Sequence, residues 1–242
     1  MTKIFYAGDS TCAQNDITTF PQTGLGQGLE LYVKKEIKIY NHAMNGRSTK
    51  SFMEEGRLAA IEREISEGDF LFIQFGHNDE KEFDKARYTT PFGTFKENLK
   101  TFINAARKVG ATPVLVTPLE RRCFEDAWKL GKGEHGDYVA GMKEVAAEEQ
   151  VALIDLNTKS RAKMEDAGAV ETTKWFMHLA KGEYPSCPEG KIDNTHLKQD
   201  GARVFAGLIA EGLQELGGIY ADLLVEGINQ VAEAKYDTVI EA

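Results

Sequence analysis

The chain has 242 residues, of which 42% are hydrophobic, and this is enough to bury one substantial core and predicts a single domain over residues 1–242. The formal net charge is −9, so a nucleic-acid partner is not expected, and no apolar run is long enough to cross a bilayer. Its cysteines, Cys12, Cys123 and Cys187, form neither a CxxC pair nor a metal-ligand spacing, so neither a disulfide framework nor a metal or other cofactor is predicted.

The chain starts with MTKIFYAGDS, in which no charged stretch is followed by a long apolar run. This start does not have the pattern of a secretory signal peptide. We therefore expect a cytoplasmic protein without a membrane partner, unless a leader has been removed. The sequence leaves open whether the protein forms a homo-oligomer.

Short apolar runs alternate with longer amphipathic stretches along the chain. The short runs are rich in β-branched or aromatic residues and predict strands at residues 3–7, 37–40, 69–75, 112–117 and 151–156. The amphipathic stretches predict helices at residues 26–36, 51–66, 94–108, 138–149 and 199–216. Residues 157–195 predict a long functional loop, and residues 217–242 a helical C-terminal tail. This alternation predicts an α/β protein with three α/β/α layers and a five-stranded parallel sheet.

A serine follows the first predicted strand, in the segment Gly8-Asp9-Ser10-Thr11. Ligands of open parallel sheets bind at the carboxyl ends of the strands, so the Ser10 hydroxyl could face a substrate there. A serine hydroxyl needs an adjacent base to act as a nucleophile near neutral pH. The alternative is a serine that caps a helix or forms a turn, which is the commoner role.

Two further polar segments lie where they could meet this serine. Asn78 follows the third predicted strand, next to the first in a flavodoxin-like order, and its amide could donate to an oxyanion. Asp193 and His196 precede the last predicted helix, and a histidine held by a carboxylate is the base of a nucleophilic triad. The alternatives are a polar turn at Asn78, and a capping aspartate with an unrelated surface histidine.

In this order the segments resemble the SGNH (GDSL-like) hydrolases, whose blocks correspond here to residues 8–10, 41–48, 76–79 and 193–196. The chain is more similar still to the rhamnogalacturonan acetylesterase branch of that family. GDST, GRSTKSF, FGHND, GATPVLVTPLERRCF and DNTHLKQDGA carry this resemblance, which covers residues 3–215. Leu25 departs from the branch, which usually has tryptophan there, and this concerns local substrate contacts rather than the triad.

The resemblance implies a flavodoxin-like SGNH hydrolase fold and a role for each matching residue. Ser10 would be the nucleophile, His196 the general base and then acid, and Asp193 the orienting carboxylate. The oxyanion hole would consist of the backbone N–H groups of Ser10 and Gly46 and the side-chain amide of Asn78. The implied reaction removes acetyl groups from carbohydrate, with pectin-derived (rhamnogalacturonan) oligosaccharides as substrate, through an acyl-enzyme on Ser10.

Other functions stay open on the same scaffold. These are a thioesterase or lysophospholipase, a xylan or simple-sugar acetylesterase, and a non-enzymatic flavodoxin-like binding module. A preference for long-chain esters would favour the first alternative, and a yellow cofactor without esterase activity would favour the last.

Several side chains near strand ends are candidates for contacts with the substrate. Arg47 and Arg122, and with them Arg121, could bind the carboxylate of a uronic acid, because a guanidinium binds carboxylates in a two-pronged geometry. Pairing with an acidic side chain of the protein is the plainer alternative. His77 could bind substrate, support the oxyanion hole or serve the structure alone. The other histidines are expected to pack or to lie on the surface. Trp128 and Trp175 are expected to pack in the core, with stacking on a sugar as the alternative.

Overall fold

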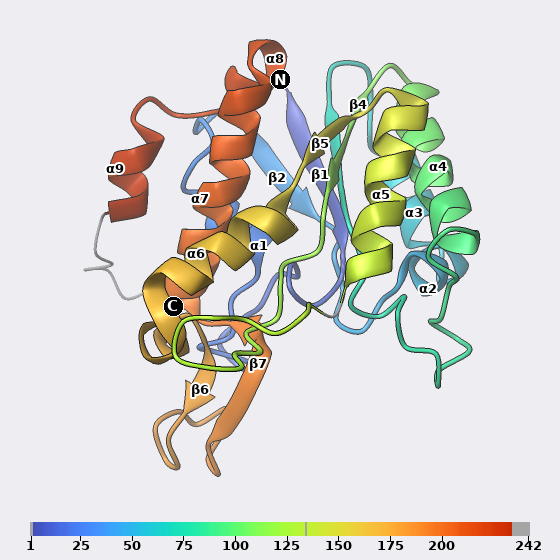
Figure 1. The fold of residues 1–242 in the computed structure, drawn as a ribbon. Helices are drawn as coiled ribbons and strands as arrows, with labels where there is room; N and C mark the ends of the chain where they lie inside the picture. Colours follow the sequence, from blue (N-terminus) through green and yellow to red (C-terminus); the bar gives the residue numbers. More distant parts are fainter. Residues whose placement is uncertain (1, 134, 234–242) are drawn as a thin grey trace.

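The computed structural model describes residues 2–133 and 135–233. Its centre is a five-stranded parallel sheet in the order β2-β1-β3-β4-β5, flanked by helices on both faces (Figure 1). The strands are β1 (Lys3–Gly8), β2 (Lys38–Asn41), β3 (Phe70–Gln74), β4 (Thr112–Val116) and β5 (Ala152–Ile154). The predicted three-layer α/β/α fold, with its flavodoxin-like order, is confirmed.

The three central strands, β1, β3 and β4, are almost entirely buried because helices cover both faces of the sheet, whereas the edge strands β2 and β5 are more exposed. Alternate side chains of β1 point to opposite faces, so Ile4 and Tyr6 enter one core while Phe5 and Ala7 enter the other. The first core packs against α1 (Leu25–Leu29), α6 (Leu156–Glu171) and α7 (Gln199–Leu216). The second packs against α2 (Thr49–Glu54), α3 (Arg57–Glu62), α4 (Thr94–Arg107) and α5 (Gly136–Glu149).

Two predicted helices are wrong in their extent. The single helix predicted at 51–66 is α2 and α3, separated at Gly56, whose φ of 73° lies in the left-handed region and ends the first helix. The helix predicted at 26–36 is only α1. Beyond α1 the backbone of Lys34 donates to Leu223 and that of Val225 donates to Tyr32, so long-range bonds replace the helical ones.

The long loop predicted at residues 157–195 is also wrong. Most of its first half is α6, which Asp155 caps by accepting a hydrogen bond from the backbone of Thr158. The rest contains η1 (Thr172–Lys174) and an antiparallel hairpin of β6 (Phe176–Leu179) and β7 (Lys191–Leu197). The hairpin extends beyond the carboxyl ends of the sheet strands, at the bottom of Figure 1.

The expected helical tail is confirmed in part. Two short helices, α8 (Gly218–Ala221) and α9 (Ile228–Glu233), follow α7, while residues 234–242 of the predicted tail lie outside the described residues. Leu223, Leu224 and Ile228 belong to the core on the α7 side, so this part is docked on the domain. No helix within residues 2–133 and 135–233 has the length and apolar character to cross a membrane.

None of the three cysteines forms a disulfide bond. Cys12 is buried, Cys187 is half-buried and Cys123 is exposed. Burial raises the pKa of Cys12 well above its ordinary value, so this thiol stays protonated beneath the turn that follows β1.

Candidate active site

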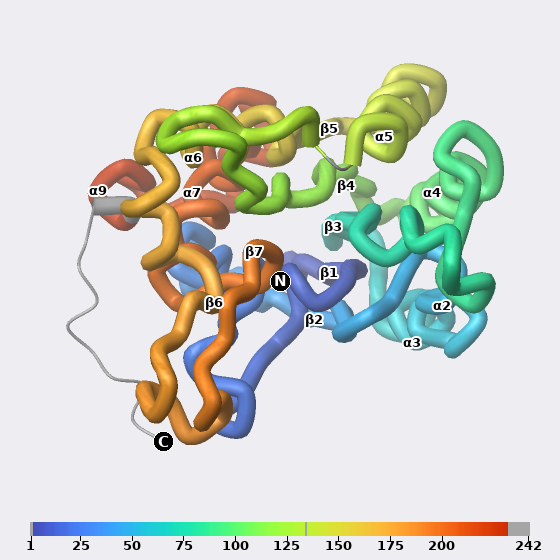
Figure 2. The backbone as a smooth tube through the Cα atoms, turned by 60° about the horizontal axis from the view of Figure 1, so that its bottom comes forward, coloured from blue at the N-terminus to red at the C-terminus, as the bar shows by residue number. Residues whose placement is uncertain are grey.

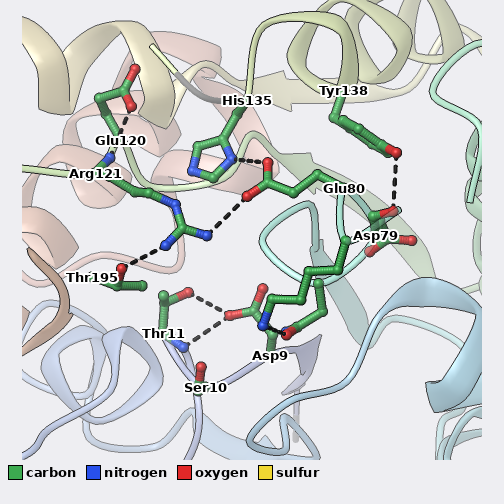
Figure 3. A network of polar contacts seen from close by, with 12 residues as sticks. Asp9, Ser10, Thr11, Asp79, Glu80, Glu120, Arg121, His135, Tyr138 and Thr195 are labelled. Carbon is green, nitrogen blue, oxygen red and sulfur yellow. Dashed lines mark hydrogen bonds and ion pairs between the residues drawn. The ribbon is translucent and has the colours of Figure 1, made fainter. Parts of the chain in front are cut away.

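The loops that follow the carboxyl ends of the sheet strands gather at one end of the molecule, together with the β6–β7 hairpin (Figure 2). Ser10 lies here, two residues beyond β1, and is partly exposed. The turn is held by the buried Asp9, whose carboxylate accepts hydrogen bonds from Thr11 N at 2.9 Å and Thr11 Oγ1 at 2.8 Å (Figure 3). Burial raises the pKa of Asp9, although these bonds from Thr11 favour its ionised form.

The structure brings Ser10, His196 and Asp193 into one hydrogen-bonded chain. His196 Nε2 lies 2.9 Å from Ser10 Oγ, and His196 Nδ1 lies 2.7 Å from Asp193 Oδ2. The other carboxylate oxygen, Oδ1, accepts from the backbone N–H groups of Thr195 and His196. The His196 side chain is 26% exposed, so the chain of bonds opens to solvent.

The charge of Asp193 fixes the direction of the proton relay. Burial raises the pKa of Asp193, but the hydrogen bond and charge of His196 and the ammonium of Lys191 lower it more, and the net pKa is well below the ordinary value. An ionised carboxylate can only accept, so His196 Nδ1 carries a proton and Nε2 presents a lone pair to the serine hydroxyl. This is the arrangement that a serine nucleophile requires.

The segment after β2 continues along β1 and brings Gly46 toward the same place. The backbone of His42 donates to Tyr6 O, and that of Met44 donates to Gly8 O at 3.1 Å. Gly46 has a φ of 80°, a left-handed conformation that favours glycine, and the turn it forms leads into α2. The segment is therefore fixed beside the end of β1 by main-chain bonds.

Asn78 follows β3, the strand on the other side of β1, and lies against this segment. Its side chain is buried, and its Nδ2 donates to Arg47 O at 3.0 Å. Blocks 41–48 and 76–79, predicted to share one crevice, are thus joined directly. The geometry brings together the residues proposed for the oxyanion hole, and their catalytic role stays a prediction.

Asp79, next to Asn78, is a site-supporting residue that the sequence reasoning missed. Its buried carboxylate accepts from the backbone and hydroxyl of Thr49, at the start of α2, and from Thr89 Oγ1 at 3.0 Å. Its carbonyl accepts from the Tyr138 hydroxyl at 3.0 Å (Figure 3). Burial raises the pKa of Asp79 to about 7, against the lowering effect of the threonine bonds.

A second polar network lies on the other side of the site (Figure 3). Arg121 donates to Thr195 Oγ1 at 2.8 Å and to Glu80 Oε1 at 2.9 Å, and His135 Nδ1 lies 2.7 Å from Glu80 Oε2. Thr195 stands between Asp193 and His196 in the sequence. Arg121, considered above as a substrate contact, is therefore engaged within the protein, where it links the catalytic segment of β7 to the loop after β3.

Arg122 does not present its guanidinium to the site, contrary to the sequence-based proposal. It is buried, and it donates to Thr172 Oγ1 at 2.8 Å, to Asn194 Oδ1 at 3.1 Å and to Ala169 O. Its backbone N–H also donates to Asn194 O. Burial of a guanidinium requires such partners, so Arg122 joins the hairpin to the end of α6 instead of contacting substrate.

Arg47 and His77 are also engaged within the protein. Arg47 pairs with Glu55 at 2.8 Å and donates to Asn45 O. This agrees with the alternative in which the arginine pairs with an acidic side chain of the protein. His77 is buried, and its ring packs edge-to-face on that of His135 with 4.3 Å between centroids. Burial, followed by electrostatic interactions with His135 and Arg121, lowers the pKa of His77 well below the ordinary value. This placement favours a structural role for His77 over contact with substrate.

The two tryptophans differ in their surroundings. Trp175 packs against Phe205 at 5.6 Å between ring centroids, as expected for a core residue. Trp128 is 65% exposed, so the expectation of core packing is wrong for this residue. Its ring lies over Gly168, where a side chain would collide with it. Within the described part of the chain, no group of three or more acidic, histidine or cysteine side chains is arranged to hold a metal ion.

Comparison with known proteins gives consistent matches over most of the chain. A profile of the GDSL-like lipase/acylhydrolase family matches residues 6–204. The chain is 42% identical over 225 residues to the rhamnogalacturonan acetylesterase RhgT of Bacillus subtilis, covering 92% of this chain and 94% of that protein. It is also 42% identical to YesY of the same organism, named a probable rhamnogalacturonan acetylesterase, over 88% of this chain and 93% of that protein. The crystal structure of protein YxiM from Bacillus subtilis superposes with a TM-score of 0.76 and 29% identity, covering 89% of this chain and 57% of that one.

Proposed function

Because the chain belongs to the GDSL-like lipase/acylhydrolase (SGNH) family, we propose that it is a serine esterase that removes acetyl groups from rhamnogalacturonan oligosaccharides. The observation that carries the chemistry is the bonded series from Ser10 Oγ to His196 to Asp193, with spacings of 2.9 and 2.7 Å. The 42% identity to RhgT over nearly the whole chain supports the substrate. The segments around Ser10, residues 8–11, 45–48 and 76–81, are mostly polar, which favours an acetyl group over a long acyl chain.

The geometry supports the following reaction. Ser10 Oγ attacks the acetyl carbonyl while His196 Nε2 takes the hydroxyl proton, and Asp193 stabilises the imidazolium that forms. The negative charge on the tetrahedral intermediate faces the N–H groups of Ser10 and Gly46 and the amide of Asn78. Collapse of the intermediate breaks the ester bond, and the leaving sugar hydroxyl takes its proton from His196. Water, deprotonated by His196, then attacks the acetyl-serine and releases acetate.

Acetate release tests this proposal directly. The purified protein is incubated with acetylated rhamnogalacturonan oligosaccharides, acetylated xylan and simple sugar acetates, with the Ser10→Ala variant as the blank. We expect the first substrate to give the highest kcat/KM. Faster release from acetylxylan would move the substrate to the sugar-acetylesterase alternative. A preference for long-chain over acetyl p-nitrophenyl esters would instead indicate a lysophospholipase or thioesterase.

A further inference from the structure

We infer that Lys81 and Arg87 form a cationic clamp on the carbonyl oxygen of Asn78, which orients and polarises this amide for the oxyanion. Lys81 Nζ donates to Asn78 Oδ1 at 2.9 Å, and Arg87 NH1 donates to the same oxygen at 3.2 Å. Neither residue stands in the family blocks quoted above. The inference rests on the proposed function, because it concerns how the proposed oxyanion hole acquires its strength.

The three contacts of Asn78 leave only one orientation for its amide. Arg47 O can only accept a hydrogen bond, whereas the ammonium of Lys81 and the guanidinium of Arg87 can only donate. The nitrogen must therefore face Arg47 and the oxygen must face the two cations. One hydrogen of Nδ2 is used by Arg47 O, and the second remains to donate to the negative oxygen of the intermediate.

Cations on an amide oxygen strengthen the donor at the other end of the same group. Positive charge at Oδ1 draws electron density from the nitrogen, and chains of hydrogen bonds polarise one another in this way. Hydrogen bonds from charged groups are about twice as strong as neutral ones. The effect grows as charge develops on the substrate oxygen, so it belongs to the transition state and not to ground-state binding.

Lys81 carries more of this effect than Arg87. Among the described residues, the half-buried Lys81 donates its hydrogen bond to Asn78 and forms no ion pair with a carboxylate, although the charges of Asp9 and Glu80 also act on it from farther away. Arg87 is partly neutralised by Asp84, with NH2 to Oδ2 at 2.6 Å, and its bond to Asn78 is longer. Arg87 also lies close to Gly46, because its NH1 would be 3.7 Å from a Cβ at that position.

The loop that carries both cations is closed onto the protein at several points. The backbone of Thr89 donates to Asp79 O at 3.0 Å, and Lys50 Nζ, from α2, donates to Lys85 O at 2.7 Å. Burial, followed by the charges of Arg87 and Arg121, lowers the pKa of Lys81. The like charges are thus held together by the fold against their mutual repulsion.

The test is a double-mutant cycle with Lys81→Met and Asn78→Ala, measured with p-nitrophenyl acetate and with an acetylated acidic oligosaccharide. We expect Lys81→Met to lower kcat about tenfold on both substrates, with KM changed less than about twofold. Lys81→Arg should restore most of the loss, and Arg87→Met should lower kcat less. In the Asn78→Ala background Lys81→Met should have almost no effect, because its partner is gone.

Lys85→Met is the matched control, since it removes the same charge from an exposed position of the same loop. Equal losses in both backgrounds would overturn the inference. So would a raised KM for the acidic substrate with kcat unchanged, since Lys81 would then bind a substrate carboxylate.

A readout without turnover separates this inference from the proposed function. The side-chain amide of Asn78 is assigned in a 15N-labelled spectrum by its loss in Asn78→Ala. Its proton resonances should move upfield in Lys81→Met, as a weaker donor does, and stay in place in Lys85→Met. If the wild-type protein hydrolysed no acetyl ester, the proposed function would fail, yet the amide shift would still decide whether the clamp exists. Unmoved resonances in Lys81→Met would refute it.

Discussion

The two halves of the site are attached to the protein in different ways. Ser10, Gly46 and Asn78 stand at the ends of neighbouring strands, and main-chain bonds such as Met44 N to Gly8 O fix them to the sheet. His196 and Asp193 stand on the antiparallel β6–β7 hairpin, outside that sheet. Besides main-chain bonds such as Arg122 N to Asn194 O, the guanidinium groups of two arginines hold this half, with Arg121 on Thr195 and Arg122 on Asn194.

This difference predicts whether a substitution away from the reacting atoms lowers stability or turnover. On the sheet half, groups that contact neither the reacting atoms nor Asn78 support an already rigid frame, so their loss reduces stability before it reduces turnover. On the hairpin half, the same kind of loss moves the base relative to the serine. A displacement of about 1 Å can lower a rate by about 100-fold. The predictions below run from the largest expected effect on turnover to the smallest.

Ser10→Ala removes the nucleophile of the sheet half. We expect kcat to fall by about four to six orders of magnitude, because no acyl-enzyme can form. The thermal midpoint should stay within a few degrees of the wild type, since Ser10 is partly exposed and its turn is held by Asp9 and Thr11. Acetate release and mass spectrometry of the acyl-enzyme test the first outcome, and thermal unfolding followed by circular dichroism measures the second. Substantial remaining turnover would remove Ser10 from the mechanism.

Asp193→Asn is the corresponding change on the hairpin half. The neutral amide can turn its N–H toward His196 Nδ1 and so favour the tautomer that has no lone pair for the serine. A fall in kcat of about 10,000-fold is expected, with KM nearly unchanged. Lys191→Met is the control, since it removes the neighbouring charge and keeps the carboxylate, and its loss should stay within about tenfold. Equal losses in the two variants would contradict the tautomer explanation.

Arg122→Met tests whether side chains position the hairpin. It removes the guanidinium donor from Thr172, Ala169 and Asn194, of which Asn194 keeps His178 as a partner, so we expect the free energy of unfolding to fall by about 1–3 kcal/mol. It should also lower kcat by about 10- to 100-fold, because His196 is no longer held as closely. Arg63→Met, at an exposed position after α3, is the matched control and should change neither quantity. If Arg122→Met reduced stability and left kcat unchanged, the hairpin half would respond as the sheet half does, and the proposed difference between them would be wrong.

Asp79→Asn tests the sheet half through pH. The unfolded chain releases the proton of Asp79 near its ordinary value of 3.8, whereas the folded protein holds it until about pH 7. Between these values the folded state binds more protons, so this group lowers the free energy of unfolding as pH rises. Asparagine has the shape of the protonated carboxyl and no proton to lose. Relative to the variant, the wild type should lose up to about 4 kcal/mol between pH 4 and pH 8, at about 1.4 kcal/mol per pKa unit.

Denaturant unfolding of both proteins across this pH range measures the difference. Turnover at neutral pH should stay within a few-fold of the wild type, because Asp79 contacts Thr49 and Thr89 and none of the proposed catalytic groups. If the free energy of unfolding of the wild type instead increased relative to that of Asp79→Asn as pH rose, Asp79 would be ionised in the folded protein throughout this pH range.

The sheet and the sheet half of the site could be predicted from the sequence. The central strands are short buried runs that end at or shortly before a glycine or proline, and the strand-end rule places Ser10 and Asn78 in one crevice. The hairpin could not be predicted in this way. α6 buries few residues, so its period is weak, and the strand pattern of β7 is obscured because its residues are mostly half-buried. Arg122 and Asp79 gained their structural roles from partners far away in the sequence, which no local pattern records.

The unequal exposure of the three thiols provides a ready means of observing the hairpin in solution. Cys123 lies on the segment after β4 and Cys187 on the connection between β6 and β7, while Cys12 is sealed beneath the nucleophile turn. A maleimide dye pair would therefore attach to the first two positions of the unaltered chain and leave the third unlabelled. Energy transfer between the dyes would then report whether the distance between the hairpin and that segment changes when an oligosaccharide binds.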